Sequence, residues 1–182
     1  MVQSLKSFKS LCLSIISIMV ILLLASCVPI GWYKIEIKNG PPAVTGAAIA
    51  YNSAAERAIM FGGMNSILVN NAWQANWIDE TWEWDGENWT KLSPTTTPPA
   101  REKHVMTYDK VRNRIVLFGG SADDSLFNDT WEWDGANWHL MKPEHTPPAR
   151  CCHAMAYDSS RKQVVLYGGW DSQNNTFFVT TQ

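Results

Sequence analysis

The chain has 182 residues, of which 46 % are hydrophobic, and a formal net charge of −2. This length is enough for one ordinary domain. Because the net charge is small and negative, the composition argues against nucleic acid or another polyanion as the main partner. The ten tryptophans are many for this length.

The first 26 residues resemble the signal peptide of a bacterial lipoprotein. Lys6 and Lys9 precede a largely apolar run from Leu11, and the run ends in LASC at Cys27. An uncleaved transmembrane anchor is the alternative, but the run is short against the roughly 20 apolar residues of a spanning helix. We therefore expect residues 1–26 to be cleaved. The remaining chain has 13 basic and 17 acidic residues, a net charge of −4.

The lipoprotein resemblance implies that Cys27 receives a diacylglyceryl group and becomes the mature N-terminus. Two acyl chains, or three if the amine is also acylated, would hold the protein stably on a membrane. The expected localisation is the cell envelope. Val28 follows the cysteine where an Asp would favour retention at the inner membrane, so the outer membrane is expected if the source is Gram-negative.

A repeated segment accounts for most of the remaining chain. PPAREKHVMTYDKVRNRIVLFGG at 98–120 matches PPARCCHAMAYDSSRKQVVLYGG at 147–169 with an offset of 49 residues, and PPAVTGAAIAYNSAAERAIMFGG at 41–63 is an earlier copy with an offset of 57. TWEWDGENW at 81–89 recurs as TWEWDGANW at 130–138. Such self-similarity is typical of solenoids and propellers.

Each copy predicts four short strands and no helix. HVMTYD alternates between apolar and polar residues, and RIVLFGG has the continuous apolar run of a strand buried on both faces. TWEWD alternates again, and the DGEN or DGAN sequence after it has the Asp and Gly of a tight hairpin turn. NWTKL closes the unit before a Pro-rich connector. Four antiparallel strands in about 50 residues predict one blade of a β-propeller.

The order of an apolar strand with twin glycines, an aromatic strand and an isolated Trp is similar to Kelch repeats. The resemblance implies a propeller in which the glycines let the chain leave the second strand and the aromatic rings fill the space between blades. The aromatic strands have Trp where Kelch repeats usually have Tyr. The residues matched to these structural roles are Gly62, Gly63, Gly119, Gly120, Gly168, Gly169, Trp32, Trp84, Trp89, Trp133 and Trp138.

The predicted strands form about three blades of an incomplete ring. Trp32 lies nine residues before Pro41, as each fourth-strand Trp does before the next Pro-Pro, so WYKIEIK is expected to be a lone fourth strand. NNTFFVTTQ resembles a degraded third strand. Because propellers typically have four to eight blades, a truncated propeller is favoured over self-association through open blade edges or an open arc. The expected units are a signal peptide at 1–26, the lipidated Cys and lone strand at 27–40, and repeats at 41–97, 98–146 and 147–182.

The loops on one face of this propeller are the candidate binding site. The connections between strands two and three and those between blades share that face, and residues 64–80 are eight residues longer than 121–129. Variable loops on a rigid scaffold often contain binding residues. Two tryptophans outside the repeat could stack on sugar rings or hold a peptide, or could cap the core. The candidate residues are Trp73, Trp77, Asp123, Asp124, Glu144 and His145.

Polar residues that recur in register are expected to build blades. Arg101 recurs as Arg150, which favours a salt bridge between blades over ligand binding. His104 and His153 occupy equivalent places in different blades, which favours hydrogen-bonded packing residues over a metal pair, because metal ligands must converge. The same recurrence argues against a catalytic dyad for the carboxylates Glu83, Asp85, Glu132 and Asp134.

Cys151 and Cys152 are adjacent. A disulfide between neighbours needs strained geometry and closes almost no loop, so it would add little stability. We interpret the pair as free thiols or an oxidation-sensitive site, with no metal role.

The leading hypothesis is a non-enzymatic binding or scaffold module at the cell envelope, which recognises a protein or glycan through the variable face. Some Kelch propellers are enzymes, so the alternative is a carbohydrate-active propeller, epimerase-like or oxidase-like, of which this chain is a fragment. A third possibility is a fragment with no activity of its own. The sequence has no nucleophile elbow, phosphate loop or zinc motif, and no cofactor, metal or nucleic-acid partner is expected.

Overall fold

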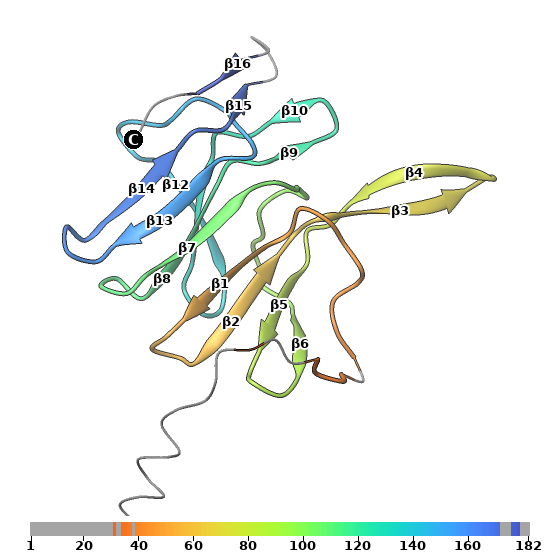
Figure 1. The fold of residues 1–182 in the computed structure, drawn as a ribbon, viewed down its shortest axis with the longest axis horizontal. Coiled ribbons are helices and arrows are strands. Elements are labelled where there is room, and N and C mark those ends of the chain that lie inside the picture. The colour runs from red at the N-terminus through yellow and green to blue at the C-terminus, as the bar shows by residue number, and fades with distance from the viewer. Residues whose placement is uncertain (1–30, 32–33, 38, 172–175, 179–182) are drawn as a thin grey trace, which may run out of the picture. The chain divides into compact units, whose positions relative to one another are not determined.

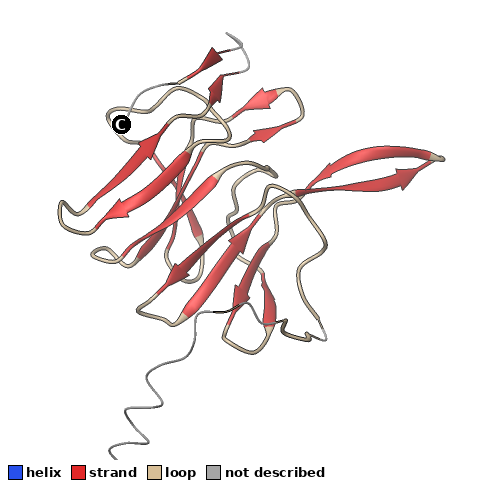
Figure 2. Ribbon diagram, in the orientation of Figure 1, coloured by secondary structure: helices blue, strands red, loops and turns tan. Residues whose placement is uncertain are grey.

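The computed structural model describes residues 31, 34–37, 39–171 and 176–178. Cys27 and Trp32 therefore lie outside the described residues. The chain divides into two units, Met1–Glu36 and Ile37–Gln182, and all elements below belong to the second. Every regular element in the described part is a strand (Figure 2), which confirms the all-β prediction. The same residues contain no helix long and apolar enough to cross a membrane.

Two complete four-stranded antiparallel blades form as predicted from the repeats (Figure 1). The first has the order β1-β2-β5-β6 and the second the order β7-β8-β11-β12. In each blade the chain runs back and forth between neighbouring strands, apart from a hairpin inserted after the second strand. The bounds are β1 (Ala48–Asn52), β2 (Arg57–Phe61), β5 (Thr81–Trp84), β6 (Trp89–Leu92), β7 (Val105–Asp109), β8 (Arg114–Phe118), β11 (Thr130–Trp133) and β12 (Trp138–Met141).

The first strands of successive blades lie side by side. β7 contacts β1 on one side and β13 (Ala154–Asp158) on the other, as the orange, green and blue arrows of Figure 1 show. This is the arrangement of inner strands around the axis of a propeller. The blades are thus stacked in chain order within residues 37–182.

The recurring carboxylates have structural roles in these blades. Asp85 and Asp134 each accept hydrogen bonds of 2.7 to 2.8 Å from the second and third backbone N–H groups after them. Such Asx turns make the DGxN hairpins tight. Glu132 forms an ion pair with Arg112 at 2.5 Å. The carboxylates therefore shape turns and pair with neighbouring cations, and they do not form an isolated acid pair.

The third blade begins with β13 and β14 (Gln163–Tyr167), followed by a short hairpin of β15 (Trp170–Asp171) and β16 (Thr176–Phe177). Phe178 donates its N–H to Gly169 at 2.9 Å, as Phe127 does to Gly120 at 3.0 Å in the second blade. Phe178 therefore corresponds to Phe127, which precedes the third strand of the second blade. The prediction that NNTFFVTTQ is a degraded third strand is wrong for its described part, because backbone pairing and not the Asn-x-Thr similarity sets the register. Residues 179–182 lie outside the described residues.

The expected lone strand WYKIEIK is also not observed in its described part. Residues 34–37 are not in a strand. Their alternating Lys, Ile and Glu side chains fit the strand period, but a strand is stable only when its backbone pairs with a neighbour. The predicted neighbour was the third strand of the last blade, which falls outside the described part.

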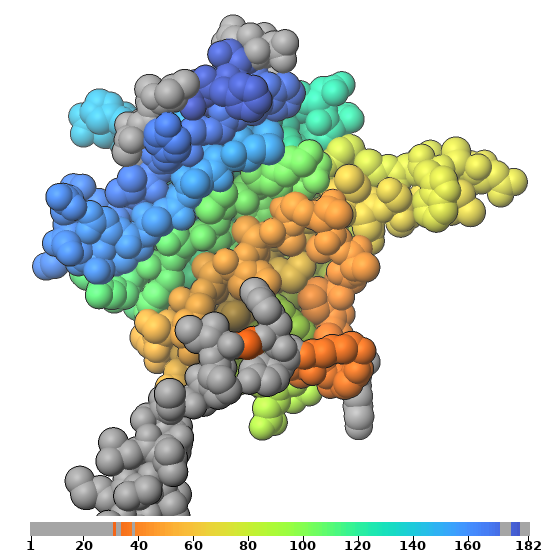
Figure 3. Space-filling view, in the orientation of Figure 1, coloured from red at the N-terminus to blue at the C-terminus, as the bar shows by residue number. Residues whose placement is uncertain are grey.

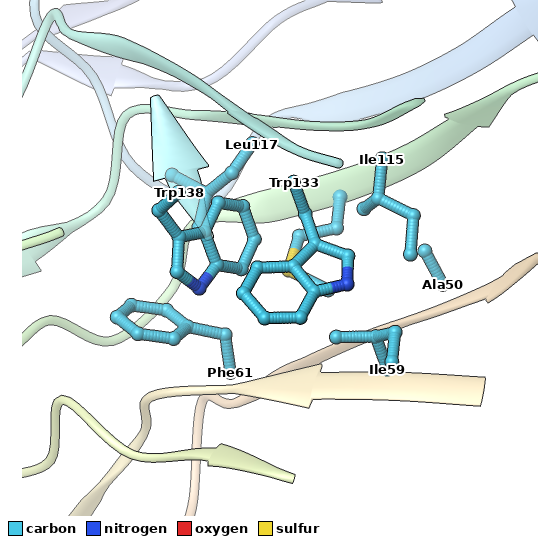
Figure 4. Packing of buried hydrophobic residues seen from close by; sticks show 8 residues of the cluster. Ala50, Ile59, Phe61, Ile115, Leu117, Trp133 and Trp138 are labelled. Carbon is cyan, nitrogen blue, oxygen red and sulfur yellow. The ribbon is translucent and has the colours of Figure 1, made fainter. Parts of the chain in front are cut away.

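The hydrophobic core lies between the first two blades. Trp133 and Trp138 of the second blade point toward Phe61 and Ile59 of the first (Figure 4). The Trp138 ring is 5.3 Å from Phe61 and 5.4 Å from Trp133 between centroids, and its Nε1–H donates to Thr81 Oγ1 at 2.9 Å. The predicted filling of the space between blades by aromatic rings is thus observed here. The buried cluster comprises Ala50, Ile59, Phe61, Met106, Ile115, Leu117, Trp133 and Trp138.

The twin glycines stand where one blade meets the connector of the next. A Cβ on Gly62 would lie 2.6 Å from the carbonyl oxygen of Arg101, and Gly62 has a φ of +70°. The N–H of Gly63 donates to the same oxygen at 2.8 Å. Gly119 and Gly120 repeat this arrangement with the following connector. Glycine is therefore needed for both the left-handed backbone and the close approach of the next blade.

Candidate binding face

Each blade has a hairpin directly after its second strand, on the side where the connectors enter. The hairpins are β3–β4 (Met64–Val69 and Ala72–Trp77), β9–β10 (Ser121–Ala122 and Ser125–Leu126) and β15–β16. One β-bridge ties each connector to the base of its own hairpin: Thr45 to Met64, Glu102 to Ser121, and Cys151 to Trp170. We call these hairpins, with residues 42–47, 101–104 and 150–153, the hairpin face.

Residues 64–77 form a regular two-stranded hairpin, where the sequence predicted a long variable loop. β3 and β4 pair in register from Met64 and Trp77 to Val69 and Ala72. The two turn residues, both Asn at 70 and 71, have φ angles of 51° and 62°. This backbone suits a two-residue hairpin, and Asn adopts it more readily than most residues. The Asn-Asn pair was the signal in the sequence for this turn.

Trp73 and Trp77 lie on the same face of β4 but do not form one platform. Trp73 is near the tip of the hairpin and is 73 % exposed. Trp77 is at the base, and its indole N–H is buried without a hydrogen-bond partner among the described residues. Four residues along a strand span about 13 Å. Of these two rings, only that of Trp73 is largely exposed to solvent.

The tip of the β3–β4 hairpin is apolar as well as exposed. Leu68 pairs across the strands with Trp73 and is 57 % exposed, and Ile67 is exposed on the opposite face. The hairpin extends away from β1 and β2, and it is the yellow projection in Figure 3. Exposed apolar side chains gathered on one projecting element are typical of an interaction surface.

Asp123 and Asp124 lie in the turn of β9–β10 and line a cleft of about 250 Å³. Lys103 enters the same cleft and forms an ion pair with Glu102 at 3.1 Å. The cleft therefore brings both signs of charge together with two thiols. Its remaining lining residues are Ser121, Ser125, Leu126, Cys151, Cys152 and Trp170.

Glu144 and His145 lie in the connector between β12 and β13, and both are exposed. His145 lines a different cavity, a largely apolar groove of about 440 Å³ between the second and third blades. The predicted candidates are therefore distributed among the hairpin tip, its base, the cleft and the groove. The structure does not bring all of them together into one site.

The groove lies between the second and third blades, at the position that the hydrophobic core occupies between the first and second blades. In the first pair of blades the corresponding space is filled by Trp133 and Trp138. Among the described residues the third blade has no strand that corresponds to β11 or β12. We therefore assign the groove to the packing of blades. Its residues Val116, Phe118, Met155 and Leu166 stand one repeat after the core residues Ile59, Phe61, Met106 and Leu117.

Arg101 joins adjacent blades through its backbone, while its salt bridge lies within one blade. Its carbonyl accepts from Gly63 at 2.8 Å and its N–H donates to Ile78 at 3.3 Å, both in the first blade. The buried guanidinium binds both oxygens of Asp129 in its own blade, at 2.6 and 2.8 Å, and stacks over the Phe127 ring at 4.0 Å. Burial would raise the pKa of Asp129, but Arg101 lowers it below its usual value. The prediction that Arg101 forms a salt bridge between blades is thus wrong.

The other blades vary this arrangement. Arg150 donates to the carbonyl of Gly168 at 2.8 Å and stacks over Phe178 at 3.8 Å. In the first blade Val44 takes the place of the arginine. Glu80, which stands where the second blade has its carboxylate, binds Lys91 at 2.5 Å instead. The carboxylate at this position is therefore paired with a cation in both of the first two blades, although the first blade has no arginine in its connector.

His104 and His153 are packing residues in different blades, but the predicted hydrogen bonds are not observed, because the buried ring nitrogens of both have no hydrogen-bond partner among the described residues. Each ring meets the edge of a phenylalanine of the preceding blade, Phe61 or Phe118, with centroids 5.6 Å apart. Burial lowers the pKa of His104 to about 3 and that of His153 to about 4, and a nearby guanidinium adds to both shifts. Both rings are therefore neutral near pH 7. Within the described ranges no group of three or more His, Cys, Asp or Glu residues is placed to hold a metal ion.

Acidification is expected to destabilise the protein between pH 6.5 and about pH 4 through these histidines. An unfolded chain protonates His at about pH 6.5, whereas the folded pKa values are about 3 and about 4. The unfolded state binds more protons in this window, so the free energy of unfolding falls by up to about 2 kcal/mol per His at pH 5. Urea titrations at pH 7 and pH 5 measure the loss. The variant with His104→Leu and His153→Leu should lose much less on acidification, and an equal loss would contradict the assignment.

Comparison with known proteins shows the fold and does not identify a function. No protein-family model and no curated protein matches the chain. The solved structure of YjhT matches with a TM-score of 0.60 and 14 % sequence identity, over 82 % of this chain and 44 % of that chain. This chain thus spans less than half the length of YjhT. At this identity the likeness concerns the fold alone: Kelch-type β-propeller blades in an incomplete ring.

Proposed function

We propose that this protein is a non-enzymatic binding module of the bacterial cell envelope, which holds a protein partner through the tip of the β3–β4 hairpin. The observation that carries the proposal is the exposed cross-strand pair of Trp73 and Leu68 on that projecting hairpin. The repeat does not require these residues, since β9–β10 and β15–β16 are hairpins of two-residue strands. Trp is also among the residues that most often dominate binding energy at protein interfaces.

The surroundings of Trp73 favour a protein over a glycan. A sugar stacked on an aromatic ring also needs polar groups beside the ring to bind its hydroxyls. The direct cross-strand neighbour of Trp73 is Leu68, which is apolar. Asn65 and Asn76, toward the base, already bind each other at 3.0 Å. The Trp73 ring thus lies directly beside an apolar side chain, while the polar groups nearest the tip are the amides of the turn residues Asn70 and Asn71.

The envelope location rests on the leader sequence. The apolar run and LASC favour lipidation at Cys27, and an acylated N-terminus would hold the blades at a membrane surface. A binding module anchored in this way can keep a partner near the membrane without any chemistry of its own. Labelling cells with an alkyne fatty acid tests the anchor, and Cys27→Ser should abolish the label.

Site-specific photo-crosslinking tests the binding site. A photoreactive amino acid at position 73, in cells of the source organism, should give one dominant crosslinked protein. The matched control is position 111, because Val111 is an exposed apolar residue in the β7–β8 turn, which is not on the hairpin face. Equal crosslinking from both positions would contradict the proposal.

The identified partner then allows a quantitative test. Trp73→Ala should weaken its binding at least about 30-fold, the effect of losing an interface hot spot of about 2 kcal/mol. Gln74→Ala, on the other face of the same strand, should change it little. Both variants should keep the wild-type melting temperature because both side chains are exposed. Turnover of sialic acids or oligosaccharides by the wild-type chain would instead favour the alternative, a carbohydrate-active propeller.

A further inference from the structure

Cys151 and Cys152 occupy a position where the other blades have no thiol. The equivalent residues are Glu102–Lys103 in the second blade and Thr45–Gly46 in the first. The second residue of each pair has a positive φ, between 57° and 66°. The first residue of each pair bridges to its own hairpin. Because three different sequences fold in the same way here, the blade does not need cysteines at this position.

The two sulfurs are close but differently accessible. Their Sγ atoms are 3.3 Å apart, and both residues line the cleft of about 250 Å³ on the hairpin face. Cys151 is buried, with 3 % of its surface exposed, whereas Cys152 is exposed. Burial raises the pKa of Cys151 to about 12. Lys103 lines the same cleft, and its ammonium is attracted by a thiolate on either cysteine.

We propose that this pair is a site of thiol–disulfide exchange, with Cys152 as the nucleophile and Cys151 as the resolving thiol. The substrate class is a low-molecular-weight disulfide, with glutathione disulfide as the probe. An exposed thiol with a second thiol 3.3 Å away, in a cleft that also contains the Lys103 ammonium, is an arrangement suited to such exchange. This inference does not depend on the binding role of the hairpin tip.

The exchange has two balanced steps. The Cys152 thiolate attacks one sulfur of the small disulfide, the S–S bond breaks, and one thiolate leaves with the bonding electron pair. The Cys151 thiol then gives up its proton to solvent and attacks the Sγ of Cys152, which releases the second thiolate. The protein loses two protons and two electrons, and the small disulfide is reduced to two thiols.

The fold holds the pair in place for the second step. Cys151 exchanges two backbone hydrogen bonds with Trp170, at 3.3 and 2.9 Å, and the N–H of Cys152 donates to Lys103 at 3.1 Å. The Cα atoms of neighbouring residues are about 3.8 Å apart, shorter than the 4.4–6.8 Å usual for disulfides. The closed disulfide is therefore strained and easily reduced. The pair can thus be oxidised and reduced repeatedly, and it does not cross-link the fold permanently.

Peptide mapping of the full chain tests the proposal. Trypsin cuts after Arg150 and Arg161, so one peptide, 151–161, contains both thiols and separates them from the other two cysteines. After incubation with glutathione disulfide and acid quenching, the wild-type peptide should lose the mass of two hydrogens. In Cys151→Ser it should instead gain one glutathionyl group at Cys152. In Cys152→Ser it should stay reduced over the same time.

The same reaction in urea is the control for folding. In the unfolded chain both single variants should gain the glutathionyl group at similar rates, because burial no longer protects Cys151. Equal rates in the folded protein would overturn the assignment of roles. A wild-type peptide that keeps its glutathionyl group without closing would show that Cys151 does not resolve the mixed disulfide, and would also overturn the proposal.

Discussion

Replacing Trp138 with alanine is expected to lower the free energy of unfolding by about 3–5 kcal/mol, the usual cost of truncating a buried tryptophan. Trp138 is 1 % exposed and lies between the blades, against Phe61 and Trp133. The truncation opens a cavity and leaves the Thr81 hydroxyl without the indole N–H that it accepts. Urea denaturation followed by circular dichroism measures the change, since Trp fluorescence is altered by the substitution itself.

Trp89 is the matched control for this experiment. It follows the same DGxN turn in the first blade, and its ring is 5.5 Å from Trp84, close to the 5.4 Å between Trp138 and Trp133. It is only partly buried, and no blade precedes it among the described residues. Trp89→Ala should therefore cost about 1–2 kcal/mol, in line with partial burial. Equal losses for the two variants would mean that each Trp acts within its own blade.

Arg101→Ala is expected to have an effect of similar size, about 3–5 kcal/mol, as for breaking a buried ion pair. The guanidinium is fully buried, and it also donates to the carbonyl of Gly119 at 3.0 Å. Its loss leaves Asp129 charged and unpaired in a partly buried position. Arg161→Ala is the control, because the Arg161 side chain is 75 % exposed in its pair with Asp158. That change should cost under about 1 kcal/mol.

A double-mutant cycle separates the two causes of this loss. In the variant with Arg101→Ala and Asp129→Asn the uncompensated charge is gone, so the double variant should be more stable than the sum of the single changes predicts. The part that Asp129→Asn does not restore then reports packing against Phe127 and the bonds to backbone carbonyls. Strict additivity would show that the ion pair contributes nothing.

The blade strands could be predicted from the sequence because their signals are local and repeated. Alternation in HVMTYD, the apolar run in RIVLFGG and the DGxN turns each act over a few residues, and two or three copies agree. The β3–β4 hairpin was missed because its long sequence occurs once, and the hairpins at the same place in the other blades have strands of only two residues. Its turn signal, Asn70 and Asn71, was present but lay within a segment read as a loop. The segments WYKIEIK and NNTFFVTTQ at the two ends of the repeats were misassigned, because a strand forms only where its backbone pairs with a neighbouring strand, whatever the pattern of its side chains.

The candidate site was predicted less well than the fold. The expected order of the strands placed the connections between strands two and three, and those between blades, on one face of the propeller. It gave no distances between their side chains. Trp73 and Trp77 are four residues apart in sequence, yet one is at the tip and the other at the base of a hairpin. The cleft at Asp123 and the cysteines was not foreseen as one feature, because it forms where the second and third blades meet. Contacts of that kind depend on the backbone of two separate repeats.

The sequence by itself determined the local conformation of this protein: the strand period, the turns at Asp-Gly and the left-handed glycines follow from the residues present within each repeat. Only the tertiary structure decided which of the repeated side chains are buried. TWEWDGENW and TWEWDGANW form the same strand and turn, but Trp138 is buried between two blades whereas Trp89 is only partly buried. Burial is set by the neighbouring blade, and that is the physical reason why nearly identical segments are expected to contribute different free energies.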